Sequence, residues 1–366
     1  MNHFHSRLSI ALYISLVTAY GIFANSTTCG ARPSPTADDA VTKPIDPPHR
    51  PITAVAWDTA GLQIVAASDA QIEILDPRSL QRVWKISVEM QKICQLAFSA
   101  DAKHLLVAGG NPSEMGCVEL YDWTSKKLLA RHTNISLKAS SSDSSERTKA
   151  SFRDVVTSVC WLSDQSGWIE GSWQGLGLVR SLDGIVVNTF DGHSGPILTV
   201  ACLDDQHAVS AGIDQTIRLW NRNNGAEVKS LDNHTGSVTW LQSKPNPRDS
   251  TARQLLSASE DSTIRLWEPS IGRLVRFARL SSAPIVVCSS SKESRLLVGL
   301  ENNSILELDM LSLETKVLQE SNVSDPSQKS AAGARIEAML AVPALEHESP
   351  GEVIVWRQSG VSRLQH

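Results

Sequence analysis

A short run of apolar residues interrupted by polar ones recurs seven times between residue 51 and the end of the chain. The seven runs begin at Ile52, Ile93, Val156, Ile197, Val238, Ile285 and Ile336. Three of the six separations equal 41 residues, and the longer ones contain polar insertions, the longest of which covers residues 135–150. Alternation over a run of this length predicts a β-strand that is buried on one face.

Further short runs follow the first one inside most units. In the fourth unit they read HAVSAG and TIRLW, and in the fifth they read QLLSAS and TIRLW. Asp, Asn, Gly and Ser bound these runs and favour turns. No segment after residue 30 has a long apolar period of about 3.6 residues, so we expect little helix. Four short strands in every ~40–45 residues are typical of a propeller blade.

The pattern therefore predicts an all-β chain, namely a seven-bladed β-propeller of four-stranded antiparallel blades over residues 51–366. Closing such a ring leaves only short, protected sheet edges. Strand rhythm alone leaves six blades open as an alternative.

Two of the units share polar and aromatic residues at matching offsets. The fourth unit contains Gly192, His193, Ser210, Asp214 and Trp220, and the fifth contains His234, Ser257, Asp261 and Trp267. In both units the Ser lies four residues before the Asp, and the Trp lies six residues after it. These units resemble the WD-repeat family, whose pattern is Gly-His, a Ser or Thr, a turn Asp and a final Trp-Asp. The other units diverge, with Leu75, Tyr121 and Leu308 at the Trp position.

The resemblance implies that each tetrad is structural. In the family the Asp accepts from one imidazole nitrogen, the other nitrogen meets the Ser hydroxyl, and the indole N–H completes the chain. Such a closed network satisfies buried polar groups and leaves no free nucleophile. Unit seven shows only three strands, and family propellers often take the missing one from the N-terminal segment. Residues 41–47 are positioned for this, although their two prolines make a poor strand.

The first 50 residues are expected to lie outside the propeller. Residues 1–24 combine a basic start with an uncharged apolar stretch, which predicts a cleaved signal peptide or, alternatively, an N-terminal membrane anchor. Residues 25–50 are rich in Pro, Ser and Thr and predict a linker. Cys29 offers a weak lipidation site, because the residues before it depart from the usual bacterial pattern.

The net charge and the absence of catalytic motifs reduce the number of function classes that the sequence supports. The net charge of -5 argues against nucleic-acid binding, which needs a clustered basic surface. The sequence contains no HExxH, GxSxG or Walker-type motif, so no catalytic residue, metal site or cofactor is predicted. Four of the six cysteines (Cys94, Cys160, Cys202 and Cys288) fall in the inner runs, where we expect small buried side chains in preference to disulfides or metal ligands.

We therefore expect a non-catalytic WD-repeat scaffold that holds a protein or peptide partner on one propeller face. The signal-like start predicts export, to a bacterial periplasm or cell envelope or as a secreted protein. The polar stretches at 135–150 and 321–333 fall at equivalent connections between blades, where they could flank a binding surface. The alternative is a divergent propeller enzyme of hydrolase or dehydrogenase type, with a carboxylate or His cluster at the central channel.

Overall fold

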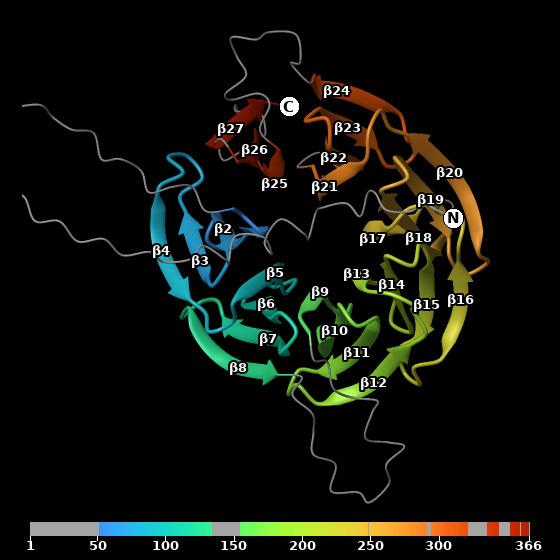
Figure 1. Ribbon diagram of the computed structural model, residues 1–366, viewed down its shortest axis with the longest axis horizontal. Coiled ribbons are helices and arrows are strands. Elements are labelled where there is room, and N and C mark those ends of the chain that lie inside the picture. The colour runs from blue at the N-terminus through green and yellow to red at the C-terminus, as the bar shows by residue number, and fades with distance from the viewer. Residues whose placement is uncertain are drawn as a thin grey trace, which may run out of the picture. The chain divides into compact units, whose positions relative to one another are not determined.

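The described part of the molecule is a ring of seven antiparallel β-sheets (Figure 1). The computed structural model describes residues 51–133, 154–247, 249–290, 294–320, 335–343, 352–358 and 360–365. Every regular element in these ranges is a strand, and none of them holds a helix that could cross a membrane. The predicted signal peptide at 1–24, the linker at 25–50, Cys29 and the polar stretches at 135–150 and 321–333 lie outside the described residues.

Consecutive strands build each blade, and we letter them a to d from the centre of the ring outwards (Figure 1). Blade one contains β1 (Ala54–Asp58), β2 (Gln63–Ser68), β3 (Gln71–Leu75) and β4 (Arg82–Ser87). Blade two contains β5 (Lys92–Phe98), β6 (His104–Asn111), β7 (Met115–Asp122) and β8 (Lys127–Thr133). Blade three contains β9 (Val156–Trp161), β10 (Gly167–Ser172), β11 (Leu176–Ser181) and β12 (Val186–Asp191). Blade four contains β13 (Ile197–Cys202), β14 (His207–Gly212), β15 (Ile217–Asn221) and β16 (Glu227–Leu231).

The remaining three blades follow the same plan. Blade five contains β17 (Val238–Asn246), β18 (Asp249–Ser259), β19 (Thr263–Glu268) and β20 (Arg273–Arg279). Blade six contains β21 (Pro284–Ser289), β22 (Arg295–Leu300), β23 (Ile305–Asp309) and β24 (Thr315–Gln319). Blade seven contains β25 (Ile336–Val342), β26 (Glu352–Arg357) and β27 (Gly360–Gln365). The prediction of seven antiparallel blades is confirmed, although the seventh sheet has three strands within the described residues.

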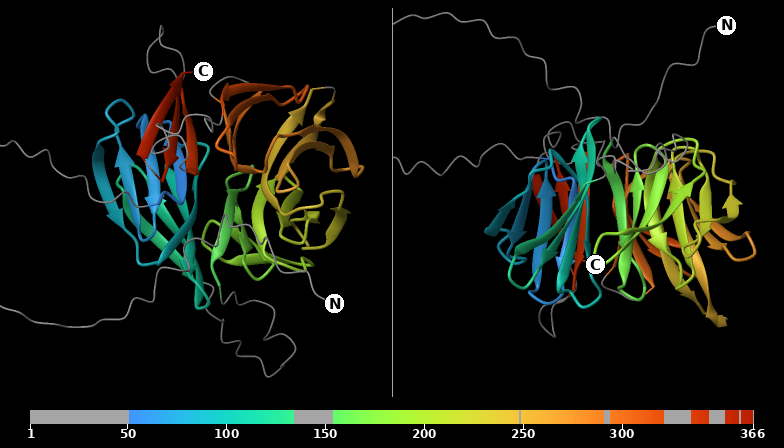
Figure 2. Two further views of the ribbon diagram at one scale, coloured as in Figure 1. Left: turned by 45° about the horizontal axis from the view of Figure 1, so that its top comes forward. Right: turned by 90° about the horizontal axis from the view of Figure 1, so that it is seen from below.

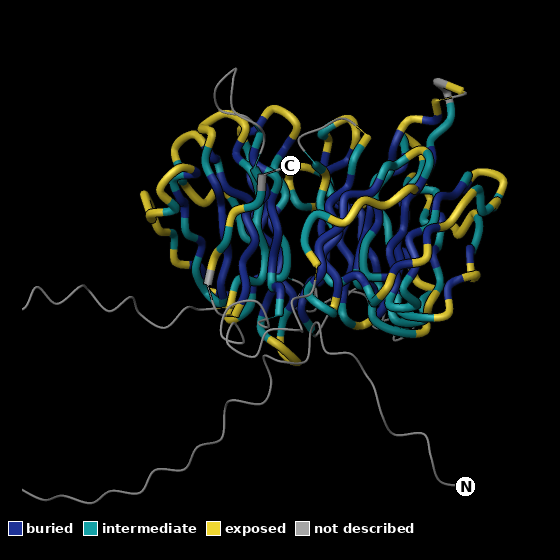
Figure 3. Tube along the Cα trace, turned by 90° about the horizontal axis from the view of Figure 1, so that it is seen from above, coloured by how far each residue is buried: buried dark blue, intermediate teal, exposed yellow. Residues whose placement is uncertain are grey.

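Seven hydrophobic clusters lie between neighbouring blades and form the core of the ring. Successive residues of one strand point to opposite faces of its sheet, so they join different clusters. Val65 of β2 packs with Val107 of blade two, whereas the preceding residue Ile64 packs with Trp356 of blade seven. Burial accordingly follows the middle strands, and exposure concentrates at the turns and outer strands (Figure 3). Seven junctions for seven sheets rule out a six-bladed ring.

Polar contacts reinforce the junction between blade seven and blade one. The Ile52 amide donates to Glu337 Oε2 at 3.0 Å. Arg363 of β27 donates from Nη2 to the carbonyl of Pro77 at 2.7 Å and also to that of Arg78. The first and last described blades are therefore joined by side chains as well as by the apolar cluster around Trp356.

The five cysteines in the described residues are free thiols. Cys94, Cys160, Cys202 and Cys288 lie on the innermost strands as predicted, but each is only half-buried. Their burial is partial because strand a has a neighbouring strand on one edge only, so its residues border the centre of the ring.

Candidate functional site: two buried tetrads and the channel mouth

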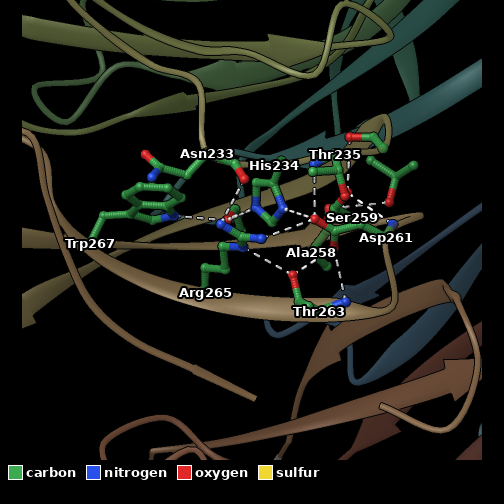
Figure 4. Close-up of polar contacts among 12 residues, drawn as sticks. Asn233, His234, Thr235, Ala258, Ser259, Asp261, Thr263, Arg265 and Trp267 are labelled. Carbon is green, nitrogen blue, oxygen red and sulfur yellow. Dashed lines mark hydrogen bonds and ion pairs between the residues drawn. The ribbon is translucent and has the colours of Figure 1, made fainter. Parts of the chain in front are cut away.

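The tetrad of blade five is an unbroken chain of hydrogen bonds (Figure 4). The indole of Trp267 on β19 donates to Ser257 Oγ on β18 at 2.9 Å. Ser257 Oγ lies 2.8 Å from His234 Nε2, and His234 Nδ1 lies 2.8 Å from Asp261 Oδ2. His234 comes from the loop before β17, and Asp261 from the turn between β18 and β19. Four separate segments of the blade therefore meet in this network.

The hydrogen-bond partners of His234 determine which of its ring nitrogens carries the proton. A carboxylate only accepts, so His234 Nδ1 carries the hydrogen that Asp261 receives. Nε2 then accepts from the Ser257 hydroxyl. Burial lowers the pKa of His234, although Asp261 opposes this shift, so the imidazole is neutral at pH 7.

Blade four repeats the same geometry. Trp220 Nε1 donates to Ser210 Oγ at 2.7 Å, and Ser210 Oγ lies 2.7 Å from His193 Nε2. His193 Nδ1 lies 2.8 Å from Asp214 Oδ2. Each of the eight residues singled out from the sequence thus contacts its expected neighbour.

Two flanking residues that sequence reasoning missed complete each network. In blade five the Thr263 hydroxyl donates to Asp261 Oδ1 at 2.5 Å, and Arg265 Nη2 lies 3.2 Å from Asp261 Oδ2. In blade four Thr216 donates to Asp214 Oδ1 at 3.0 Å, and Arg218 Nε donates to the Thr216 hydroxyl at 3.3 Å, not to Asp214. The signal was present, since both units contain the string TIRLW, whose Thr and Arg supply these contacts.

The hydrogen bonds also fix the charge on both aspartates. Burial alone would raise the pKa of Asp214, but the contacts to His193 and Thr216 outweigh it and lower the pKa to about 2. The pKa of Asp261 is lowered as well, since His234, Thr263 and the Thr235 amide outweigh the effect of burial. Both carboxylates are therefore ionised near neutral pH.

Blade three carries a different network at the same place. Glu170 on β10 occupies the strand position that Ser210 holds on β14, and it is fully buried. Trp168 Nε1 and Arg180 Nε both donate to Glu170 Oε1, each at 2.7 Å. An ion pair thus replaces the His and Ser of the tetrad. The only signal for it in the sequence is one acidic residue inside the apolar strand GWIEGS.

Blade two uses a third arrangement. The hydroxyl of Tyr121, which stands at the Trp position, donates to Glu119 Oε2 at 2.7 Å. Arg131 of β8 donates from Nε to Glu119 Oε1 at 2.8 Å. Contact with the Glu119 carboxylate and burial both raise the pKa of Tyr121, burial more strongly. A buried carboxylate bound by an arginine is therefore shared by blades two and three.

Both tetrads contain a Ser, a His and an Asp in the order of a hydrolase triad. Ser257 has no exposed surface, Ser210 is 1% exposed, and each also accepts an indole N–H. A nucleophile must reach its substrate, which these two hydroxyls do not. Among the described residues, no group of three or more His, Cys, Asp or Glu side chains is placed to bind a metal ion.

A cavity of about 720 Å³ lies at the centre of the ring, against the innermost strands of blades two to five. Its lining includes turns between strands a and b, for example at Ala100 and Ser163, and we call this end of the ring the a–b face. Apolar side chains such as Trp161 line it together with Arg253 and Asp205. The strands β17 and β18 are the longest described strands, and their hairpin projects from the ring (Figure 2).

Two thiols border this cavity. Cys160 of β9 and Cys202 of β13 come from neighbouring blades. Burial raises the pKa of Cys160 to about 11, so this thiol stays protonated at neutral pH. Cys202 Sγ lies 3.4 Å from the carbonyl oxygen of Asp204. A protonated thiol is a poor nucleophile, so Cys160 contributes wall surface here.

The comparison with known families fits this geometry. Residues 184–221 and 225–268 each match the family model described as "WD domain, G-beta repeat". These two stretches contain both tetrads. The chain therefore contains two WD repeats. The family model thus matches the two repeats in which the His–Ser–Asp–Trp network is intact, and not the blades in which glutamate replaces it.

The relatives of this chain match only part of it. Telomerase protein component 1 of Mus musculus is 23% identical over 215 residues, which is 57% of this chain and 8% of that protein. Ribosome biogenesis protein YTM1 of Kluyveromyces lactis is 31% identical over 142 residues, or 37% of this chain and 32% of YTM1. YTM1 of Saccharomyces cerevisiae is 27% identical over 173 residues, which is 40% of this chain and 36% of that YTM1. The chain thus spans about a third of YTM1 and less than a tenth of the telomerase protein.

The expected location was wrong. We expected export to a bacterial periplasm or cell envelope, or secretion. These relatives come instead from a mouse and from yeasts, and their names refer to telomerase and to ribosome biogenesis. An apolar N-terminal stretch is, by itself, weak evidence for where a protein is located.

Proposed function

We propose that this WD-repeat propeller is a non-catalytic scaffold that holds a protein or peptide partner on one face of the ring. The observation that carries this proposal is the burial of Ser210 and Ser257. The two Ser–His–Asp sets of blades four and five are sealed and fully hydrogen-bonded, so they stabilise blades and do not reach a substrate.

Two further facts support a protein partner. The relatives are named as a component of telomerase and as ribosome biogenesis proteins, and neither name is that of an enzyme acting on a small molecule. The net charge of -5 favours a protein or peptide over nucleic acid. A rigid ring with variable turns suits such a role, because the blades fix the positions of the loops that make contact.

The alternative, a divergent propeller enzyme, requires a carboxylate or histidine free to act at the channel. Asp204 accepts from the backbone amides of Gln206 and His207 and from His207 Nδ1. Asp205 Oδ1 accepts from the Ser163 hydroxyl at 2.5 Å. Because Asp204 is bound within its own turn and Asp205 is bound to Ser163, the enzyme alternative has less support.

Cross-linking in the source organism tests the proposal. The tagged full-length chain is cross-linked in cells, purified under denaturing conditions and analysed by mass spectrometry, with Asp183→Ala as a matched control at an exposed turn carboxylate. We expect the same partner protein to be linked to residues of one face in both chains. Recovery of the chain without any reproducible partner would contradict the scaffold proposal.

A further inference from the structure

The hydrogen-bonding groups around the channel cavity are largely used within the protein. Gln165 accepts from the Ala100 amide and donates to the Leu162 carbonyl. Gln242 exchanges hydrogen bonds with Ser289 of blade six. These groups are not available to a ligand, because breaking such internal bonds costs as much as the new ones provide.

Two side chains of the lining, Gln95 and Arg253, keep donors that no described residue uses. Gln95 accepts from the Val159 amide through Oε1 at 2.9 Å, which leaves its NH₂ group without a partner among the described residues. Arg253 donates from Nε to Ser243 Oγ at 3.1 Å, and for its two terminal nitrogens the described residues likewise provide no partner. Arg253 is half-buried and lines the cavity. A ligand that satisfies these groups must therefore bring acceptors.

Arg253 is also held in place by neighbouring residues. Ser243 Oγ, which accepts from Arg253 Nε, itself donates to the Leu203 carbonyl at 3.2 Å. This contact ties the blade-five hairpin to blade four and limits the motion of the guanidinium. A guanidinium with its Nε already bound presents its outer nitrogens as a planar fork, the geometry that matches a carboxylate.

The main chain of the channel wall favours a peptide over a small molecule. The innermost strand of a blade has a partner on one edge only, so alternate N–H and C=O groups point to the channel. Side chains satisfy some of these groups, as when Ser158 Oγ accepts from the Val200 amide at 3.0 Å. An extended peptide pairs with the groups that remain. The apolar wall at Trp161 provides a contact surface for a neighbouring apolar side chain.

Two carboxylates of the cavity lining, Asp204 and Asp205, oppose an anionic ligand, and Asp204 already accepts from the amides of Gln206 and His207. Asp205 also lines the cavity, and it is an exposed residue at the rim. Solvent screens its charge more than that of the half-buried Arg253. Removing the Asp205 charge should therefore strengthen the binding of an anion, and this sign distinguishes an acidic ligand from a basic one.

Building on the scaffold function, we propose that the channel mouth at the a–b face binds an extended segment of the protein partner through a carboxylate that Arg253 receives. The segment carries an Asp or Glu side chain, with an apolar side chain beside it against Trp161. The NH₂ group of Gln95 provides a second donor.

Binding of defined peptide pools tests this assignment. Two pools of short fluorescein-labelled peptides, random except for a central Glu in one and a central Gln in the other, are titrated with the full chain by fluorescence anisotropy. We expect the Glu pool to bind more tightly by about tenfold or more, since a charge-assisted bidentate pair is involved. Arg253→Gln should abolish this preference, Arg253→Lys should keep part of it, and Asp205→Asn should increase it.

The outcomes separate this site from the scaffold proposal. Equal binding of both pools by the parent, or an unchanged preference in Arg253→Gln, overturns the Arg253 site. A folded Arg253→Gln chain, checked by circular dichroism, that still cross-links its native partner at full yield leaves the scaffold standing and removes the channel as its site. A Glu preference that depends on Arg253, with no partner cross-linked to any chain, supports the site and contradicts the scaffold.

Discussion

Glu170 of blade three occupies the strand position that Ser210 occupies in blade four, and each accepts a hydrogen bond from a tryptophan indole at 2.7 Å. The indoles reach this position from opposite strands. Trp168 lies on β10 and pairs across the hairpin with Arg180, whereas Trp220 lies on β15 and pairs with Ala208. Both blades therefore provide a buried acceptor for an indole N–H. In blade four this acceptor belongs to the His–Ser–Asp network, and in blade three it belongs to an ion pair.

Breaking this ion pair should destabilise the ring strongly. Glu170→Leu removes the carboxylate that binds Arg180 Nε and leaves a guanidinium that is nearly buried, which should cost about 3–5 kcal/mol in the free energy of unfolding. Adding Arg180→Leu should recover much of this loss, because the unpaired charge is then gone. Urea denaturation of the single and double variants measures both. Losses that simply add would show that the two side chains do not depend on each other.

The blade-five tetrad should contribute less than a buried ion pair. Asp261→Ala leaves His234 Nδ1 buried without its acceptor, and we expect a loss of about 1–3 kcal/mol. Asp183→Ala, at an exposed carboxylate in a turn of blade three, is the matched control and should change stability little. Urea midpoints at pH 7 compare the two. Equal midpoints for both variants would mean that Asp261 has no structural role.

Acid should weaken the blade-four tetrad. The pKa of Asp214 is about 2 in the folded chain and near its ordinary value of 3.8 when the chain is unfolded. Because the folded pKa is the lower one, the stabilisation is complete above about pH 4 and is lost as the pH falls towards 2. The free energy of unfolding of the parent should therefore fall across this range. Asp214→Asn should start lower and show a shallower fall, whereas parallel curves would contradict the linkage.

The contact between blades seven and one should depend on Arg363. Arg363→Ala removes its donors to Pro77 and Arg78 and its ion pair with Glu352, and should cost about 1 kcal/mol. We expect faster hydrogen exchange in β26 and β27, with no change in blade four. Arg273→Ala, which breaks an exposed ion pair within blade five, is the control. Uniform exchange changes around the ring would show that Arg363 acts globally and not at this junction.

The sequence predicts the strands better than it predicts the surfaces. Alternation located all seven innermost strands, and the offsets around Asp214 and Asp261 brought together residues that do meet in space. Glu170 and Arg180 were missed because their partners lie on adjacent strands with no fixed spacing in the chain. Arg253 was missed because its neighbours at the channel come from blades two to five, and only closure of the ring places them together.

Each blade packs its two faces against two different neighbouring blades. Residues that are adjacent in the sequence can therefore pack against residues that lie far apart in the chain. Ile64 and Val65 are adjacent, yet Ile64 packs with Trp356 near the end of the chain and Val65 packs with Val107 in the next blade. A change in side-chain volume at one of them calls for compensation in blade seven, and at the other in blade two. Substitutions that arise side by side in this protein can therefore have unconnected evolutionary histories.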